Sequence, residues 1–571
     1  MDSAFDFVVV GGGTAGLCLA ARLAEDTSNT VCVLEIGKDH KGNDDIAVPG
    51  NYMANFGKEW DAGLLSIPQT HAANRPLYSP RGQGLGGSSL YIVQLDLRAP
   101  AMEYDALESM LGATGWNFRE FTKYFRKSQI LRGTGMPETH PLTPDPAAFG
   151  EGPVAATPPR FTPAINEFYF KACADLNIPF NPEGGSSKNS GVWPSLASIH
   201  PESAQRAYLE PNRHKENLKI FTEAQATRIV FREGVKPLTA TAVEYKHLSS
   251  SDEVILTVHA RKEVILCAGA YRTPHLLELS GIGDKKNIPG IPQLIDLPGI
   301  NQDHLSTLFL CETDQSIPSC DMLMNPKTDP AESGMFSAVP LSYSYLTLDQ
   351  FASPEKQAII KEMAASADES TTSIASPRSL ALLKKWMEDP QAYQVELVMV
   401  PHYVPFLPNA EFDPTKKYCF IAAILTHPFS RGSVHTDPSN PLENPILDIG
   451  MVESDIDREI LVEGIKFIRK LITQPRMRDE AGVRPIAPSN DVKTEEEIKR
   501  YIALAGYTSY HPIGTAAMLP REDFGVVDPR LVVYDTTNLR IVRVFTVLRT
   551  WADQCGRPTR PFFLSILART P

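Results

Sequence analysis

The 571-residue sequence lacks an apolar run of about 18 residues, the length that a helix needs to cross a bilayer. It also lacks the pattern of a secretory leader. Its first six residues carry no basic side chain, and the apolar run that follows, Phe7–Val10, is short. We therefore expect neither a signal peptide nor a transmembrane segment, and a cytoplasmic location.

Basic residues are comparatively few, with 55 Lys and Arg against 68 Asp and Glu, which gives a formal net charge of −13. This balance argues against a nucleic-acid partner and against a polybasic membrane surface. The eight cysteines contain no CxxC pair, so free thiols are expected rather than a disulfide framework. We predict no metal site. The 42% apolar content suffices for a large core, and an enzyme with a small-molecule substrate fits these limits.

A glycine-rich turn near the N-terminus has the context of a dinucleotide-binding unit. The apolar run Phe7–Val10 predicts a buried strand, Gly11–Gly16 fits G-x-G-x-x-G, and helical spacing begins at Leu17. A second strand, Val31–Leu34, ends at Glu35. The helix N-terminus would offer its N–H groups and partial positive charge to a pyrophosphate.

Each position in this unit has a physical role. Gly11 allows the tight turn, Gly13 lets the backbone approach a pyrophosphate, and Gly16 lets helix and strand pack closely. The Glu35 carboxylate can accept both ribose hydroxyls, and an acid here disfavours a 2′-phosphate. The pattern alone does not separate FAD from NAD, and a purely structural strand–helix turn is the alternative.

Three further segments distinguish these cofactors. They are Pro80–Ser89, Gly269–Gly283 and Tyr510–Met518. Together with the N-terminal unit they resemble the glucose–methanol–choline (GMC) oxidoreductase family of FAD enzymes. The resemblance runs from residue 5 to about residue 542, and Gly269–Gly283 matches the family's second signature at every defined position.

The resemblance implies an α/β fold with a Rossmann-like FAD-binding domain and a substrate-binding domain built on a mainly antiparallel sheet. We expect residues 1–155, 200–310 and 505–571 in the first domain, and 156–199 and 311–504 in the second. The sequence itself predicts strands at Gln394–Val400 and Tyr418–Leu425 and a helix over Asp455–Ile472.

The cofactor is expected to be FAD, held partly by glycine turns and partly by backbone groups. Gly86, Gly87 and Ser88 can approach a diphosphate or flavin with little steric hindrance. In the family, backbone groups near Ala226 hold the adenine. The cofactor-binding residues predicted in this way are Gly11, Gly13, Thr14, Ala15, Gly16, Glu35, Ile36, Gly86, Gly87, Ser88 and Ala226. Thr273-Pro274 reads as the N-cap and first turn of a helix.

His511 is the predicted catalytic residue. The segment His511–Thr515 occupies the position of the family's general base, although any one of the 13 histidines is more often a surface or core residue. An imidazole titrates near neutrality and can take a hydroxyl proton. The aromatic residues Tyr403, Phe406, Tyr507 and Tyr510 could line a pocket, but we interpret them as ordinary core.

The sequence departs from the family pattern in several places. Ile92 stands where the family has a polar flavin contact, Gln83 stands where a basic residue is common, and the segment 296–304 is shortened. After Val542 the family ending is replaced by an unrelated sequence over 543–571. Gln554, or Trp551 or Ala552 in another alignment, falls at the second catalytic position, where the family has His or Asn.

These observations leave three functions open. The first is oxidation of an alcohol to a carbonyl, in a small-molecule or natural-product pathway, with His511 taking the proton and flavin the hydride. The second is a non-redox lyase or cyclase that keeps FAD as a structural group. The third is a product inactivated by its C-terminal ending. The electron acceptor, oxygen or another molecule, is left open.

Overall fold

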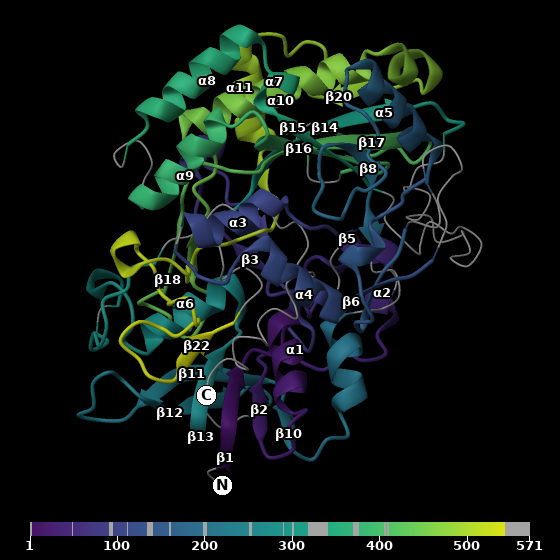
Figure 1. The fold of residues 1–571 in the computed structure, drawn as a ribbon. Helices are drawn as coiled ribbons and strands as arrows, with labels where there is room; N and C mark the ends of the chain where they lie inside the picture. Colours follow the sequence, from purple (N-terminus) through teal and green to yellow (C-terminus); the bar gives the residue numbers. More distant parts are fainter. Residues whose placement is uncertain are drawn as a thin grey trace.

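The computed structural model describes residues 3–47, 49–90, 95–110, 112–133, 141–158, 162–197, 203–250, 254–288, 290–299, 302–317, 341–368, 376–404, 407 and 410–542. Two sheets organise this part of the chain. One lies at the N-terminal end of the molecule, and the other lies at the opposite end beneath a group of helices (Figure 1).

The first sheet has the strand order β10-β2-β1-β13-β12-β11, with β22 paired to β13. Its parallel part contains β10 (Leu218–Phe221), β2 (Val31–Leu34), β1 (Ser3–Val10), β13 (Ile255–Leu266) and β22 (Leu539–Ile541). Antiparallel strands β12 (Ala240–His247) and β11 (Ala224–Phe231) extend it. The β-branched run at the end of β1 is buried, which explains why this apolar segment forms a central strand.

The predicted Rossmann-like unit is confirmed. Helix α1 (Thr14–Leu23) follows β1 through the glycine turn and leads to β2. A Cβ atom at Gly16 would lie 1.9 Å from the carbonyl oxygen of Gly11, so only glycine permits this close helix–strand contact.

The predicted start of helix α6 is wrong. The helix spans Gly269–Leu279 and contains Pro274 in its interior, so Thr273 lies within it rather than capping it. Proline cannot donate to the carbonyl of Ala270, four residues earlier. A hydroxyl from another segment replaces that donor: Thr515 Oγ1 donates to the oxygen of Ala270 at 2.6 Å.

The second sheet is antiparallel, with the order β15-β16-β17-β14-β20 and β21 also paired to β14. Its strands are β15 (Ser342–Thr347), β16 (Tyr393–Val400), β17 (Lys417–Leu425), β14 (Leu305–Thr313), β20 (Arg484–Ala487) and β21 (Tyr507–Thr508). Helix α10 (Asp455–Ile472) packs against β17, β14 and β16. The two strands and the helix predicted here are confirmed.

The remaining helices are α2 (Asp44–Ala47), α3 (Ala101–Ser109), α4 (Phe118–Ser128), α5 (Ala164–Asp175), α7 (Leu348–Phe351), α8 (Pro354–Ser366), α9 (Pro377–Glu388) and α11 (Glu495–Ala505). The short strands are β3 (Leu64–Leu65), β4 (Tyr78–Ser79), β5 (Leu95–Asp96), β6 (Gln129–Leu131), β7 (Val154–Ala156), β8 (Gly191–Pro194), β9 (Leu196–Ala197), β18 (Ser433–His435) and β19 (Ile446–Asp448).

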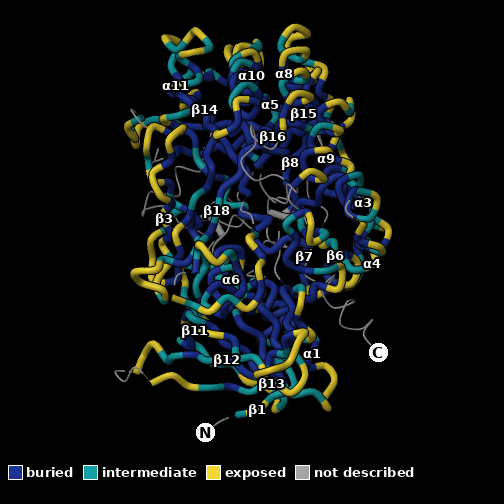
Figure 2. The backbone as a smooth tube through the Cα atoms, turned by 90° about the vertical axis from the view of Figure 1, so that its left-hand side faces the viewer, coloured by how far each residue is buried: buried dark blue, intermediate teal, exposed yellow. Residues whose placement is uncertain are grey.

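Each sheet has its own large buried apolar cluster, and buried backbone continues between them (Figure 2). Strand β14 crosses the predicted boundary at residue 310, and β21 joins the second sheet just before His511. The exact domain limits stay a prediction. None of the helices in the described ranges is both long and apolar enough to cross a membrane.

Candidate active site

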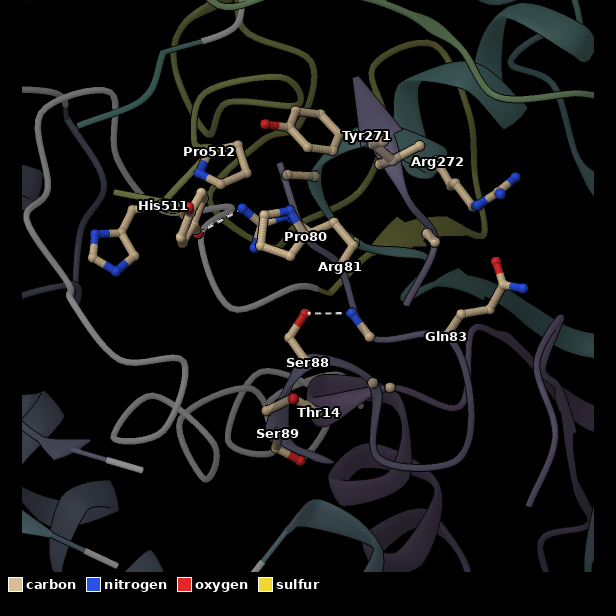
Figure 3. A pocket seen from close by; sticks show the side chains of 18 of the residues that line it. Thr14, Pro80, Arg81, Gln83, Ser88, Ser89, Tyr271, Arg272, His511 and Pro512 are labelled. Carbon is tan, nitrogen blue, oxygen red and sulfur yellow. Dashed lines mark hydrogen bonds between the residues drawn. The ribbon is translucent and has the colours of Figure 1, made fainter. Parts of the chain in front are cut away.

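A cavity of about 390 Å³ brings together residues from both sheets. One end is lined by the β1–α1 turn, the end of β2 and the start of α6. The other end is lined by the second sheet and by the segment around His511. In Figure 3, Thr14, Ser88 and Ser89 lie together on one side, and His511 and Arg272 lie far apart across the cavity.

Two glycine turns meet at the N-terminus of α1. Gly87 adopts a φ of +54°, and a Cβ atom there would lie 2.8 Å from Cα of Gly13. The Gly86 nitrogen donates to the oxygen of Gly12 at 2.9 Å, while Thr14 Oγ1 donates to the oxygen of Gly86 at 3.1 Å. These contacts hold the two turns side by side and leave their backbone open toward the cavity.

Glu35 lies buried at the end of β2 and accepts backbone hydrogen bonds from Gly12 and Gly37. The nitrogen of Gly12 donates to one carboxyl oxygen at 2.7 Å, and that of Gly37 donates to the other at 2.8 Å. Burial raises the pKa of Glu35, while these donors and the positive charge of Arg272 act in the opposite direction. Each oxygen retains a lone pair that can accept a further hydroxyl.

Ala226, on β11, lines the cavity beside Glu35 and Ile36. Arg272, from the first turn of α6, lines the same end and donates to the side chain of Asn444 at 2.8 Å. The neighbouring Gln225 donates to the oxygen of Leu442 at 2.6 Å. This end therefore combines an apolar strand surface with one fixed cation.

His511 lines the other end of the cavity. Its backbone nitrogen donates to Asp303 Oδ1 at 2.9 Å. Its ring meets the ring of His304 nearly perpendicularly, with 5.5 Å between centroids. Burial lowers the pKa of His304 well below its ordinary value, and the charges of His511 and His427 act in the same direction. A neutral imidazole thus packs against the predicted base.

The second sheet supplies an apolar wall opposite these groups. Tyr343, Val398, Ala422 and Leu308 are consecutive cross-strand neighbours and all line the cavity. Further apolar and aromatic lining comes from Tyr52, Met53, Phe56, Leu341, Val400, Phe420, Ile424, Tyr507 and Tyr510. Among the described lining residues at this end, charge can come only from Arg81 and His511.

The structure brings most of the predicted site residues together. The predicted residues that line the cavity are Gly11, Gly13, Thr14, Ala15, Glu35, Ile36, Gly87, Ser88, Ala226 and His511. Gly16 and Gly86 do not line it and act through packing and backbone contacts. Gln83 lines the cavity. Ile92, Trp551, Ala552, Gln554 and the segment 543–571 lie outside the described residues.

Sequence reasoning missed several residues of the site. Arg81 and Arg272 each lie inside a recognised motif, but the groups that they contact, Tyr510 and Asn444, are distant in sequence and gave no local signal. Asp303 lies in a segment noted only for its shortened length. Tyr507 and Tyr510, interpreted as core, line the cavity instead, whereas Tyr403 is buried core and Phe406 lies outside the described residues.

Comparison with known proteins gives consistent results. Two family models described as GMC oxidoreductase match residues 5–303 and 428–543. The GMC oxidoreductase family protein Mala s 12 of Malassezia sympodialis is 32% identical over 558 residues, which cover 94% of this chain and 88% of that protein. The oxygen-dependent choline dehydrogenase of Pseudomonas syringae pv. tomato is 28% identical over 564 residues, covering 95% and 89%.

Solved structures of two other proteins share this fold. An FAD-dependent oxidoreductase from Chaetomium thermophilum superposes with a TM-score of 0.86 at 24% identity, covering 99% of both chains. A fungal aryl-alcohol oxidase superposes with a TM-score of 0.82 at 26% identity, covering all of this chain and 98% of the other.

Proposed function

Because the chain belongs to the GMC family of FAD-dependent oxidoreductases, we propose that it oxidises an uncharged, largely apolar alcohol to a carbonyl compound, with His511 as the base. The observation that carries this proposal is the cavity itself. It joins the glycine-rich cradle at one end to His511 and the apolar wall at the other.

The residues at the first end fit FAD. The open backbone of Gly13 and Gly87, at the N-terminus of α1, suits a pyrophosphate. The buried Glu35 carboxylate suits ribose hydroxyls, and the apolar surface at Ala226 suits adenine. When bound, FAD supplies the acceptor for the hydride that leaves the alcohol carbon.

The chain's own residues supply proton transfer and orientation. His511 lies within the same cavity, and a ring nitrogen of its imidazole takes the hydroxyl proton of the alcohol. The row Tyr343, Val398, Ala422 and Leu308 excludes water from the alcohol's substituent and aligns it. Because the proton moves to His511 as the hydride departs, no free alkoxide forms in this apolar setting.

The wall also indicates the substrate class. A cationic substrate would lose its hydration among apolar side chains, and the positive charge of Arg81 at this end would repel it. A small uncharged alcohol with an aryl or alkyl substituent gains from burial instead. The electron acceptor and any natural-product pathway stay predictions.

The test is anaerobic mixing of the purified flavoprotein with benzyl alcohol, hexan-1-ol, glucose and choline. We expect bleaching of the oxidised flavin absorbance with the first two and much slower bleaching with choline. A choline preference would contradict the substrate class. Conversion of a substrate without bleaching would indicate a lyase or cyclase, and neither bleaching nor conversion with any alcohol would reject alcohol oxidation.

A further inference from the structure

The segment that carries His511 has an unusual backbone. Tyr510, directly before His511, adopts a φ of +65°. This left-handed conformation is uncommon for a residue with a bulky side chain and persists where surrounding contacts enforce it. The direction of the His511 side chain depends on this turn, because the turn sets the path of the chain at the next residue.

Asp303 lies at the centre of the contacts that enforce the turn. One carboxyl oxygen accepts hydrogen bonds from the nitrogens of His511, at 2.9 Å, and His304, at 2.8 Å. The other accepts from Thr508 Oγ1. That same hydroxyl oxygen accepts from the nitrogen of Tyr510 at 2.9 Å. The carboxylate therefore reaches both sides of the strained residue.

Arg81 holds the turn through the carbonyl oxygen of Tyr510. Its guanidinium donates to the carbonyl oxygen of Tyr510 at 2.5 Å and lies over the Tyr271 ring, 5.5 Å from the centroid. Burial raises the pKa of Asp303 to about 6, and the positive charge of Arg81 acts in the opposite direction, toward the ionised carboxylate. Arg81 lies in the glycine-rich loop Pro80–Ser89, so it links the cradle to the base (Figure 3).

Backbone pairs flank this arrangement but do not fix His511 themselves. Gln302 and Ile513 exchange hydrogen bonds on one side, at 3.0 and 2.7 Å. Ser509 donates to the oxygen of His304 on the other, at 2.8 Å. Between these pairs, the Asp303 side chain is what satisfies the nitrogen of His511, and it is only 1% exposed.

We propose that Asp303, assisted by Arg81, is a positioning residue that holds the Tyr510–His511 turn so that the imidazole faces the reacting alcohol. The proposal rests on the proposed function of His511. Asp303 affects the rate of flavin reduction rather than substrate affinity or flavin retention, because it is absent from the residues described as lining the cavity.

The experiment compares Asp303→Ala, Asp303→Asn, Asp457→Ala and His511→Ala with the wild-type holoenzyme. Flavin content, thermal midpoint, and the rate and substrate affinity of anaerobic flavin reduction by benzyl alcohol are measured. Asparagine keeps an oxygen acceptor for the nitrogen of His511, while alanine removes it. Asp457 is a matched control, since it is buried and accepts from the nitrogens of Phe429 and Ser430, at 2.8 and 2.7 Å.

We expect Asp303→Ala to slow reduction at saturating alcohol by about 100-fold with little change in affinity, a mispositioning effect of known size. Asp303→Asn should recover most of that rate. Asp457→Ala should lower the thermal midpoint yet reduce flavin normally. Reduction within threefold of wild type in Asp303→Ala, or an equal loss in Asp457→Ala, would overturn the proposal.

If Asp303→Ala fails to fold, Arg81→Met and Thr508→Val remove the supporting contacts one at a time, and both should slow reduction. Substrate affinity should stay unchanged in Thr508→Val, because Thr508 is absent from the residues described as lining the cavity. Normal rates in both would reject the proposal. Failure of the proposed function is seen separately. In that case no alcohol reduces the flavin of the wild-type enzyme, or alcohol reduces the flavin of His511→Ala at the wild-type rate.

Discussion

The hydroxyl of Thr515 donates to the carbonyl oxygen of Ala270 at 2.6 Å, across 245 residues of sequence. Pro274, four residues later in the helix, has no N–H group to donate to that carbonyl. The hydrogen bond therefore joins the segment that carries His511 to the helix that borders the cofactor end of the cavity. A proline that would weaken an isolated helix becomes a point of attachment between two parts of the site.

We predict that Thr515→Val destabilises the protein, because the Ala270 carbonyl loses this donor in a buried site. The expected loss is about 1–3 kcal/mol, measured by chemical denaturation of the holoenzyme. Thr515→Ser keeps the hydroxyl and should therefore recover most of the lost stability. Equal stability of the valine and serine variants would show that the hydrogen bond contributes nothing.

Gly87→Ala should weaken FAD binding. Its Cβ atom would lie 2.8 Å from Cα of Gly13 and 3.3 Å from the nitrogen of Thr14, at the proposed pyrophosphate site. We expect at least a tenfold rise in Kd for FAD, which is about 1.4 kcal/mol, measured by flavin fluorescence on the apoprotein. Gly63→Ala is the control, since Gly63 has a similar φ of +60° but nothing within 4 Å. Both variants carry backbone strain, so a loss of affinity in both would assign the effect to strain.

His511→Ala should reduce the rate of flavin reduction by roughly 10²- to 10⁴-fold, the usual range for a lost general base. Bound flavin should be retained, because the cradle lies at the other end of the cavity. Exposed His214 provides a control, and its alanine variant should behave as wild type. Loss of flavin from His511→Ala would show that the residue supports cofactor binding instead.

Glu396→Gln should stabilise the protein at alkaline pH. Glu396 is fully buried on β16, where Tyr345 is its cross-strand neighbour. Burial raises the pKa of this carboxyl well above its ordinary value, and the Tyr345 hydroxyl offsets only part of the effect. The folded state therefore holds the proton more tightly than the unfolded state, so stability falls as pH rises above the ordinary carboxyl range.

Glutamine at position 396 keeps the shape of the glutamate side chain but cannot ionise. The stabilisation should be about 1–3 kcal/mol at pH 8 and close to zero near pH 4, measured as the free energy of unfolding at both values. Glu362→Gln, an exposed change on α8, should show no such pH dependence. A pH-independent effect of Glu396→Gln would contradict the shifted ionisation.

The parts of the fold governed by local pattern were predictable. The strand–glycine–helix–strand unit, the strands at β16 and β17, and α10 each depend on short-range periodicity and turn chemistry. Helix α6 was placed wrongly because the donor that replaces the missing N–H of its proline comes from Thr515, and such distant compensation leaves no local signal. Arg81 and Asp303 escaped notice for the same reason, since their roles arise from contacts between segments more than 200 residues apart.

The distribution of the cavity along the chain has a consequence for biosynthesis. Its cofactor end is built from residues between Gly11 and Leu279, so the glycine cradle, Glu35 and Ala226 have all been synthesised before the midpoint of the chain. The base and its turn come from residues near 511. Because domains fold as units during synthesis, and strand β22 (Leu539–Ile541) pairs with β13 in the first sheet, the FAD-binding unit is completed only after the segment that carries His511 has been synthesised.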